Sequence, residues 1–280
     1  MERANECDFI HMNTLFQARY GAATAPGYTL NPTLETLLEH RSVRSYQDKA
    51  LAPNTLELLI AAAQSASTSS NLQSWSVVAI EDPERKDRLA RMAGNQEHIR
   101  ACPLFLVWLV DLARLDALGD RRGLARDSLD YLELLMVGVI DATLAAQNAA
   151  IAAESMNLGI VYIGGMRNQP EAVAAELGLP PRTFGLFGMC IGHPNPERPA
   201  AVKPRLPQQA VLHREQYNAK QITAPADDYI TTMSNFYKSQ GMKTHGDWDQ
   251  HSLHRVRGPE AMAGRDRLAE ALKKLGLALR

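Results

Sequence analysis

The feature that most constrains this chain is a helical segment at residues 128–157 that nothing interrupts before Leu158-Gly159. At 1.5 Å per residue it would be about 45 Å long, more than the diameter of a small domain. It is apolar nearly all round, through Leu132, Leu134, Leu135, Met136, Val137, Val139, Ile140, Leu144 and Ile151. Such a helix must be buried on all sides, in the core of a large monomer or at the centre of a dimer. We favour the dimer, because one domain of this size cannot easily surround the helix.

Strand and helix patterns alternate around this segment. Strands are predicted at 75–80, 104–110, 160–163 and 184–191, and the continuous apolar run at 104–110 indicates a central strand covered on both faces. Asn31-Pro32, Pro53 and Asp82-Pro83 each open a helical pattern. We expect an N-terminal extension at 1–30, a core at 31–217, and a helical tail at 218–280 within the same α+β domain.

Charge and cysteine usage exclude several classes of function. The formal net charge is -1, whereas a nucleic-acid binder usually has a basic excess. The three cysteines are far apart, which argues against a disulfide framework and suits a reducing cytoplasm. The N-terminus lacks a signal-peptide pattern, and Asp141 interrupts the longest apolar stretch. We therefore expect a cytoplasmic protein with neither a membrane nor a nucleic-acid partner.

Three polar or glycine-containing clusters lie at the ends of predicted elements. His40-Arg41-Ser42-Val43-Arg44 offers positive charge and a hydroxyl, which suit a phosphate, although a solvated helix end has the same composition. Val161-Tyr162-Ile163-Gly164-Gly165 would let backbone N–H groups approach a flat ligand, or it is a simple strand-ending turn. Lys203-Pro204-Arg205-Leu206-Pro207 favours two cations on one side of an extended segment, or a rigid surface linker.

Together with two further stretches, these clusters resemble the nitroreductase family, and in particular its oxygen-insensitive NADPH nitroreductase and flavin reductase branch. The further stretches are Ser67-Thr68-Ser69-Ser70-Asn71-Leu72-Gln73-Ser74-Trp75 and Gly94-Asn95-Gln96-Glu97-His98, and the second cluster continues through Met166-Arg167-Asn168. The similarity extends from about Asn31 to Tyr217, and more weakly beyond into a helical tail with Trp248. It implies a nitroreductase-like α+β fold, in which helices flank a central, mixed but mostly antiparallel sheet and a long central helix lies at a homodimer interface.

The resemblance also implies FMN as the cofactor and gives roles to matched positions. His40, Arg41, Ser42, Lys203 and Arg205 would hold the FMN ribityl chain and phosphate. Arg44 and Gln96 would face the pyrimidine edge of the ring, and Tyr162-Ile163-Gly164-Gly165 would lie beside its hydride-accepting end. Ser67, Thr68 and Ser69 would reach the flavin bound mainly by the other subunit.

The implied activity is that of an FMN-dependent oxidoreductase. NADPH or NADH would give hydride to the flavin, which would reduce a small electrophile (a nitroaromatic, a quinone or free flavin) by ping-pong turnover. The resemblance names no catalytic side chain. Two alternatives stay open: a flavin-sequestering or regulatory protein with little turnover, and a flavin-destroying or dehalogenating enzyme that uses the charged stretch 111–127 as a lid. A plainer interpretation of the stretch 111–127 is a solvated loop or lid.

The tail departs from the branch pattern. This branch binds the 2′-phosphate of NADPH through basic residues near Trp248, but residues 237–248 of the chain offer Lys243 and His245 and no arginine. Arg265 falls where relatives place an arginine at the mouth of the site, without a supporting motif. His245, His251 and His254 form a weak zinc pattern, and we expect no metal. His98 is expected to form hydrogen bonds from a loop.

Overall fold

The strands of the larger compact unit form one sheet that carries its core. The computed structural model describes residues 6–21, 30–219 and 226–280, and the chain divides into a unit of residues 42–199 and 263–280 and a unit of residues 1–41 and 200–262. The larger unit contains β1 (Trp75–Ile80), β2 (Leu104–Asp111), β3 (Gly159–Ile163) and β4 (Thr183–Gly192) in the order β1-β2-β4-β3. All three strand pairs are antiparallel, and one parallel bridge joins Ser42 to Ile160.

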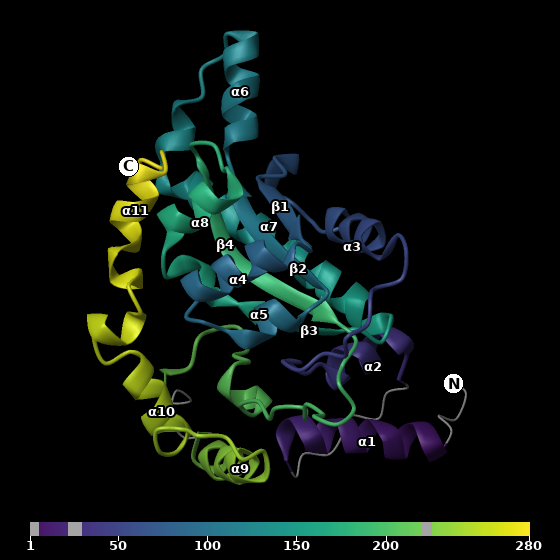
Figure 1. Cartoon of the computed structure of the whole chain (residues 1–280). Coiled ribbons are helices and arrows are strands. Elements are labelled where there is room, and N and C mark those ends of the chain that lie inside the picture. The colour runs from purple at the N-terminus through teal and green to yellow at the C-terminus, as the bar shows by residue number, and fades with distance from the viewer. Residues whose placement is uncertain (1–5, 22–29, 220–225) are drawn as a thin grey trace. The chain divides into compact units, whose positions relative to one another are not determined.

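Helices cover both faces of this sheet (Figure 1). Leu104, Leu106 and Trp108 of β2 pack with alanines of α7 (Leu132–Ser155) and with Leu59 of α3 (Thr55–Gln64). The glycines of β4 open the other face, where α8 (Pro170–Leu177) packs against β4 and α4 (Pro83–Met92) packs against α8 and α5 (Glu97–Ala101). Every residue from Leu104 to Val110 is buried, so the prediction of a doubly covered central strand is confirmed.

The remaining helices of the larger unit lie at 113–130 and at the C-terminal end. The stretch 111–127, interpreted from its charges as a loop or lid, contains the helix α6 (Ala113–Arg122) and the start of a 3-10 turn at Asp127–Asp130. Arg126 pairs with Asp116 at 2.7 Å and with Asp120, so these charged residues of the stretch form ion pairs with one another. α11 (Leu268–Lys274) contacts α8, and Leu272 and Leu277 complete the core around Phe184.

Among its described residues, the smaller unit contains helices and irregular segments but no strand. It contains α1 (Glu6–Tyr20), α2 (Pro32–Glu39), α9 (Ala226–Ser239) and α10 (Trp248–Arg255). α2 begins as predicted, because the Asn31 side chain accepts a hydrogen bond from Leu34 N at 2.9 Å and Pro32 fills the first turn. Tyr229, Met233 and Tyr237 of α9 form a small apolar cluster with Trp248.

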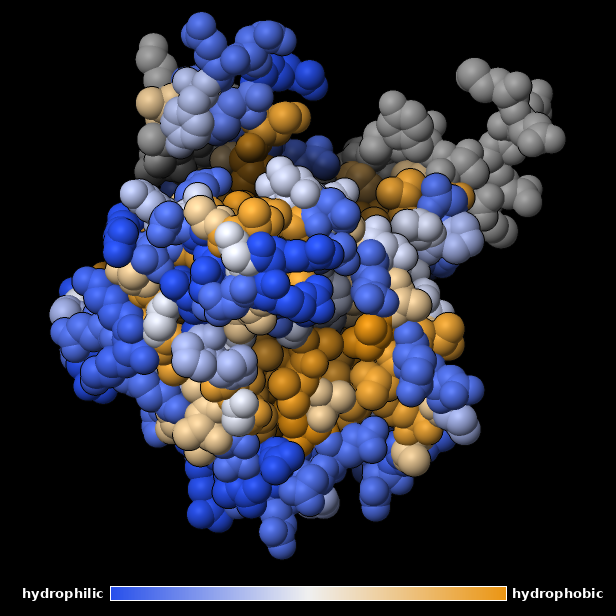
Figure 2. Space-filling view, turned by 90° about the horizontal axis from the view of Figure 1, so that it is seen from above, coloured by the Kyte–Doolittle hydropathy of each residue, from blue (hydrophilic) through white to orange (hydrophobic). Residues whose placement is uncertain are grey.

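The single chain does not bury α7 on all sides. Leu132, Met136, Ile140 and Leu144, spaced four residues apart, are 48%, 51%, 50% and 42% exposed, whereas Ala142, Ala145, Ala146 and Ala149 are fully buried. Residues four apart share one helix face, so the exposed side chains form an apolar stripe. Figure 2 shows that hydrophobic side chains gather in a patch on one face of the molecule, with hydrophilic side chains along its edges.

By length and mean hydropathy, α7 is the one helix in the described ranges that could cross a membrane. Half of the apolar 18-residue stretch of α7 that is long enough to cross a membrane is buried inside the fold, and α7 packs against α3 and the sheet. Asp141 near its middle is 1% exposed and accepts three hydrogen bonds from a neighbouring loop. These contacts identify α7 as a core helix.

Candidate cofactor site

The segment after α2 is fixed beside β3 by backbone pairing. Val43 N donates to Ile160 O at 2.8 Å, and the Val43 side chain is buried while Ser42 and Arg44 are exposed. Gly159 allows this approach, since a Cβ there would lie 2.6–2.8 Å from the Val43 side chain. The alternation of an extended segment therefore presents Ser42 and Arg44 together on its open side.

The Gly164-Gly165 turn follows β3 directly and begins a 3-10 turn. A Cβ on Gly165 would lie 2.5 Å from Ala93 O and 2.9 Å from Gln96 Nε2. Gln96 Nε2 also donates to Ala93 O at 2.7 Å, so the fold brings Gln96 against the glycine turn. Gly165 is thus required by packing against the 93–96 loop, which the sequence did not reveal.

Gly164 is more open, and two guanidinium groups lie near it. A Cβ on Gly164 would be 3.4 Å from Arg167 Nη2 and 3.9 Å from Arg265 Nη1. Arg167 Nη1 donates to Leu186 O at 2.5 Å, and Arg265 Nε donates to Asn168 Oδ1 at 3.0 Å. Burial and the Arg265 charge lower the pKa of Arg167. The fold therefore holds positive charge beside the glycine turn, and Arg167 is a candidate that we missed within a matched stretch.

His98 lies in α5, and its Nε2 is buried without a hydrogen-bond partner among the described residues. The expectation of a hydrogen-bonding loop residue is therefore wrong for this atom. Burial and the Arg44 charge lower the pKa of His98. The positive charge of Arg44 acts on the His98 ring. A buried nitrogen without a partner is the kind of polar atom that a bound ligand can satisfy.

Asp141 organises the loop that contains Ser67, Thr68 and Ser69. Its Oδ2 accepts from Thr68 Oγ1 at 2.6 Å and from Ser74 N at 3.0 Å, and its Oδ1 accepts from Ser69 N at 3.1 Å. Three other residues of the loop, Ser70, Asn71 and Gln73, have positive φ values of 49°, 55° and 51°. A strained loop needs such an anchor. The sequence could not reveal it, because Ser69 and Asp141 are 72 positions apart.

The side chain of Tyr162 points into the fold. Its hydroxyl lies 3.4 Å from Gln147 Oε1 of α7, and its ring packs edge-on against Phe187 at 5.3 Å. Ile163 is 1% exposed. The side chains of both residues are thus occupied by packing, which leaves the backbone of this segment as the part that can face a ligand.

In the smaller unit, Arg19 of α1 joins two of the predicted phosphate clusters. The Arg19 guanidinium donates to Leu38 O at 2.8 Å, His40 O at 2.9 Å and Lys203 O at 3.0 Å. Arg205 N donates to Arg19 O at 2.8 Å. Arg19 is only 5% exposed, so His40, Lys203 and Arg205 are held around one buried cation that lies in the expected N-terminal extension.

Arg41 and the Arg205 side chain are oriented by nearby backbone. Arg41 Nη1 donates to Glu39 O at 3.1 Å, and Arg205 Nη1 lies 3.4 Å from the carbonyl oxygens of Lys203 and Pro204. The boundary between the two compact units falls between Arg41 and Ser42. The structure therefore groups His40, Arg41, Lys203 and Arg205 in one unit, and Ser42, Arg44, Gln96 and the glycine turn in the other.

Comparisons with known proteins agree on one family. The family model described as the nitroreductase family matches residues 37–193, and the model of the C-terminal domain of that family matches residues 203–280. FMN reductase (NADPH) of Bacillus subtilis is 43% identical over 211 residues, which cover 75% of this chain and 82% of the relative. NADPH-flavin oxidoreductase of Vibrio harveyi is 38% identical, over 90% of this chain and 100% of the relative. The solved structure of B. megaterium NfrA2 is similar with a TM-score of 0.83 and 34% identity, over 90% of this chain and 100% of that one.

Proposed function

Because the chain belongs to the nitroreductase family, we propose that it is an FMN-dependent NAD(P)H oxidoreductase that reduces nitroaromatics, quinones or free flavin. The observation that carries the proposal is the Gly164-Gly165 turn at the end of β3, with Gln96 packed against Gly165 and two guanidinium groups near Gly164. This arrangement combines the open backbone of Gly164 with fixed positive charge, which suits an electron-poor ring that gains negative charge on reduction.

The residues present fit FMN. Beyond its chain neighbours, the nearest atom to where a Gly164 Cβ would be is Arg167 Nη2 at 3.4 Å, and His98 Nε2 is buried and unpaired in the described part of the chain. We assign the ring to the backbone of Ile163, Gly164 and Gly165, with Arg44 and Gln96 at its polar edge. Ser42, His40, Arg41, Lys203 and Arg205 would hold the ribityl chain and phosphate, because guanidinium and ammonium groups form charge-assisted hydrogen bonds with phosphate.

When bound, FMN supplies a two-electron carrier that accepts hydride from a nicotinamide and passes it to an electrophile. The protein binds and orients this carrier, and its cations favour the charge that develops on the ring. We propose no side chain as an acid or base. NADPH is the proposed donor because both curated relatives above are named for NADPH, and Lys243 and His245 are exposed for its phosphate.

The first test is the absorbance spectrum of the purified protein during anaerobic addition of NADPH and, separately, NADH. We expect flavin bands that bleach with either donor, at lower concentrations of NADPH than of NADH, and that return when a quinone is added. Bands that never bleach would favour the flavin-sequestering alternative. A colourless protein that takes up no FMN would contradict the assignment of the cofactor.

We also propose that the protein works in the cytoplasm as a homodimer, paired through the apolar stripe of α7. Leu132, Met136, Ile140 and Leu144 expose about half of their surfaces in the single chain. A second copy would cover these side chains, because an interface around a two-fold axis buries the same patch on both subunits. It would also bring Thr68 and Ser69, which Asp141 ties to α7, and the adjacent Ser67 toward the partner's flavin. The buried free thiols Cys102 and Cys190 suit a reducing compartment.

Replacing Ile140 with lysine tests the dimer. We expect the dissociation constant of the dimer to rise about 1,000-fold or more, because each buried ammonium costs several kcal/mol and the interface contains two copies. Sedimentation velocity across a dilution series measures this change. Leu118→Lys, on α6 and 40% exposed, is the matched control and should leave the dimer intact. A wild-type chain that sediments as a monomer with flavin bound would refute the interface.

A further inference from the structure

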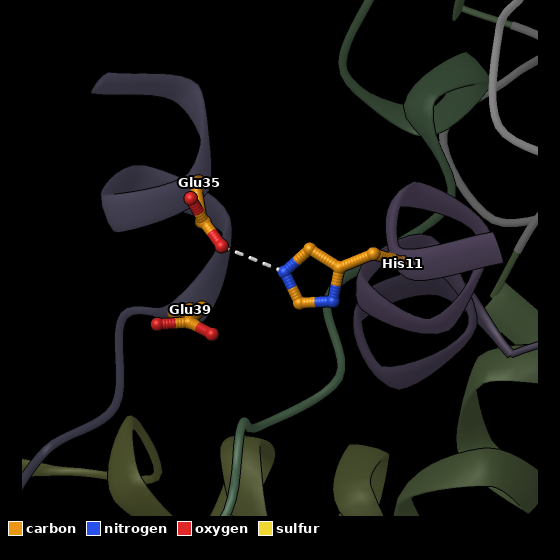
Figure 3. A group of neighbouring side chains, drawn as sticks. All are labelled: His11, Glu35 and Glu39. Carbon is orange, nitrogen blue, oxygen red and sulfur yellow. Dashed lines mark hydrogen bonds and ion pairs between the residues drawn. The ribbon is translucent and has the colours of Figure 1, made fainter. Parts of the chain in front are cut away.

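Three side chains of the smaller unit converge between α1 and α2, and none of the three is among the residues assigned to FMN. His11 comes from α1, and Glu35 and Glu39 come from α2 (Figure 3). One ligand atom of each lies within 4.8 Å of the other two, and His11 Nε2 is 2.8 Å from Glu35 Oε1. Sequence alone gave no signal for this group, since His11 and Glu35 are 24 positions apart.

Apart from the contact of Glu35 with His11, the two glutamates are placed unfavourably. Glu35 and Glu39 are four residues apart on one helix, where like charges destabilise each other. Glu39 is the last residue of α2, where the helix dipole disfavours negative charge, and α2 has no basic residue in its last turn. A positive charge between the three side chains would offset both effects.

The mixture of donors favours zinc among divalent cations. Zinc accepts imidazole nitrogen and carboxylate oxygen in four-coordinate sites and can leave one position to water, whereas calcium and magnesium prefer oxygen ligands alone. Bonds of normal length would separate the imidazole nitrogen and a carboxylate oxygen by about 3.3 Å across a tetrahedral zinc ion. The present 2.8 Å contact would therefore have to open slightly, which is feasible because both side chains are 44% exposed.

We propose that His11, Glu35 and Glu39 bind one zinc ion that fastens α1 to α2. The site lies eight residues before Arg19, about 12 Å along the helix. Arg19 also ties α1 to the end of α2, through Leu38 O and His40 O. Zinc and Arg19 thus form two attachments of the same pair of helices.

A second histidine group of this unit supplies the control. The rings of His245 and His254 lie 4.1 Å apart, and His251 Nδ1 accepts from His245 N at 3.4 Å. The guanidinium of Arg257 contacts the ring of His254. Burial and the Arg257 charge lower the pKa of His254, and the same charge opposes a metal ion there. We therefore expect zinc to favour His11, Glu35 and Glu39.

The test is calorimetric titration of zinc chloride into the tag-free, FMN-loaded full chain, with Glu39→Gln, His11→Ala and His254→Ala in parallel. We expect one equivalent to bind to the wild type and to His254→Ala. Glu39→Gln and His11→Ala should weaken binding by at least about tenfold, because each removes one of three protein ligands. Glu39→Gln keeps the shape of the side chain and the contact between His11 and Glu35, so it separates loss of a ligand from loss of structure.

Cobalt substitution gives an independent readout. Cobalt(II) should show the visible absorption of a low-coordinate site in the wild type and in His254→Ala, and this absorption should be lost in Glu39→Gln. The proposal fails if the wild type takes up no zinc at 100 µM free metal, or if His254→Ala abolishes binding while Glu39→Gln does not. Neither readout depends on turnover, so a failure here is distinguishable from a failure of the proposed oxidoreductase activity.

Discussion

Replacing Asp141 with alanine should lower the free energy of unfolding by about 3–5 kcal/mol, because it leaves one buried and two partly buried donors without this charged acceptor. The carboxylate is 1% exposed and accepts from Thr68 Oγ1, Ser69 N and Ser74 N. The loop that it anchors also has the positive φ values of Ser70, Asn71 and Gln73, so it would relax once the acceptor is gone. Urea denaturation measures the stability, and amide exchange across residues 67–74 measures the order of the loop.

Two further variants make this result specific. Asp141→Asn keeps the volume but replaces one acceptor oxygen with an N–H donor, so it should lose about half as much stability as alanine. Glu133→Ala, at an exposed position on the same helix, should change stability by less than about 0.5 kcal/mol. A loss below about 1 kcal/mol in Asp141→Ala would show that Asp141 does not anchor the loop. If the loop reaches the partner's flavin, FMN affinity should fall in the same order.

Replacing Arg19 with alanine should weaken FMN binding by about 30- to 150-fold, equivalent to about 2–3 kcal/mol. Arg19 donates to Leu38 O, His40 O and Lys203 O from a site that is 5% exposed, so its loss leaves three carbonyl groups without this donor. The segments that carry His40 and Lys203 would then be free to separate. Quenching of flavin fluorescence during titration of the apoprotein measures the affinity.

Riboflavin, which lacks the phosphate, distinguishes the mechanism of this effect. If Arg19 acts by positioning the phosphate clusters, riboflavin affinity should fall much less than FMN affinity. An equal fall for both ligands would assign Arg19 to general stability instead. Arg19→Lys should be intermediate, since an ammonium group lacks the planar fork of donors. Gln17→Ala, an exposed change on α1, serves as the control.

Much of the fold could be predicted because its signals are local. The buried run at 104–110, the Asn31-Pro32 helix start and the long α7 follow from apolar runs and capping residues within a few positions. α6 was not predicted, because its charges resemble those of a loop. In the structure, they form ion pairs such as Arg126 with Asp116 and Arg182 with Asp116. Those partners lie up to 66 positions apart, beyond the reach of a sequence window.

The candidate site shows the same division between local and distant information. The glycine turn and the basic clusters could be found by composition, since each occupies at most five consecutive residues. The residues that position the glycine turn and the basic clusters could not be found in this way. Arg19 reaches Lys203 across 184 positions and Arg265 reaches Asn168 across 97, and neither has a motif around it. Those pairings exist only once helices and strands are assembled.

The contact between Gly159 and Val43 also constrains how such proteins diverge. Any side chain at position 159 would overlap the Val43 methyl groups, so an alanine there is tolerable only if position 43 shrinks at the same time. The two positions should therefore covary among homologues, as contacting pairs do. Because Val43 stands between Ser42 and Arg44, drift at Gly159 would shift the segment that carries both. Natural selection that acts on Ser42 and Arg44 would then also constrain the buried Gly159, which is not among the residues assigned to the ligand.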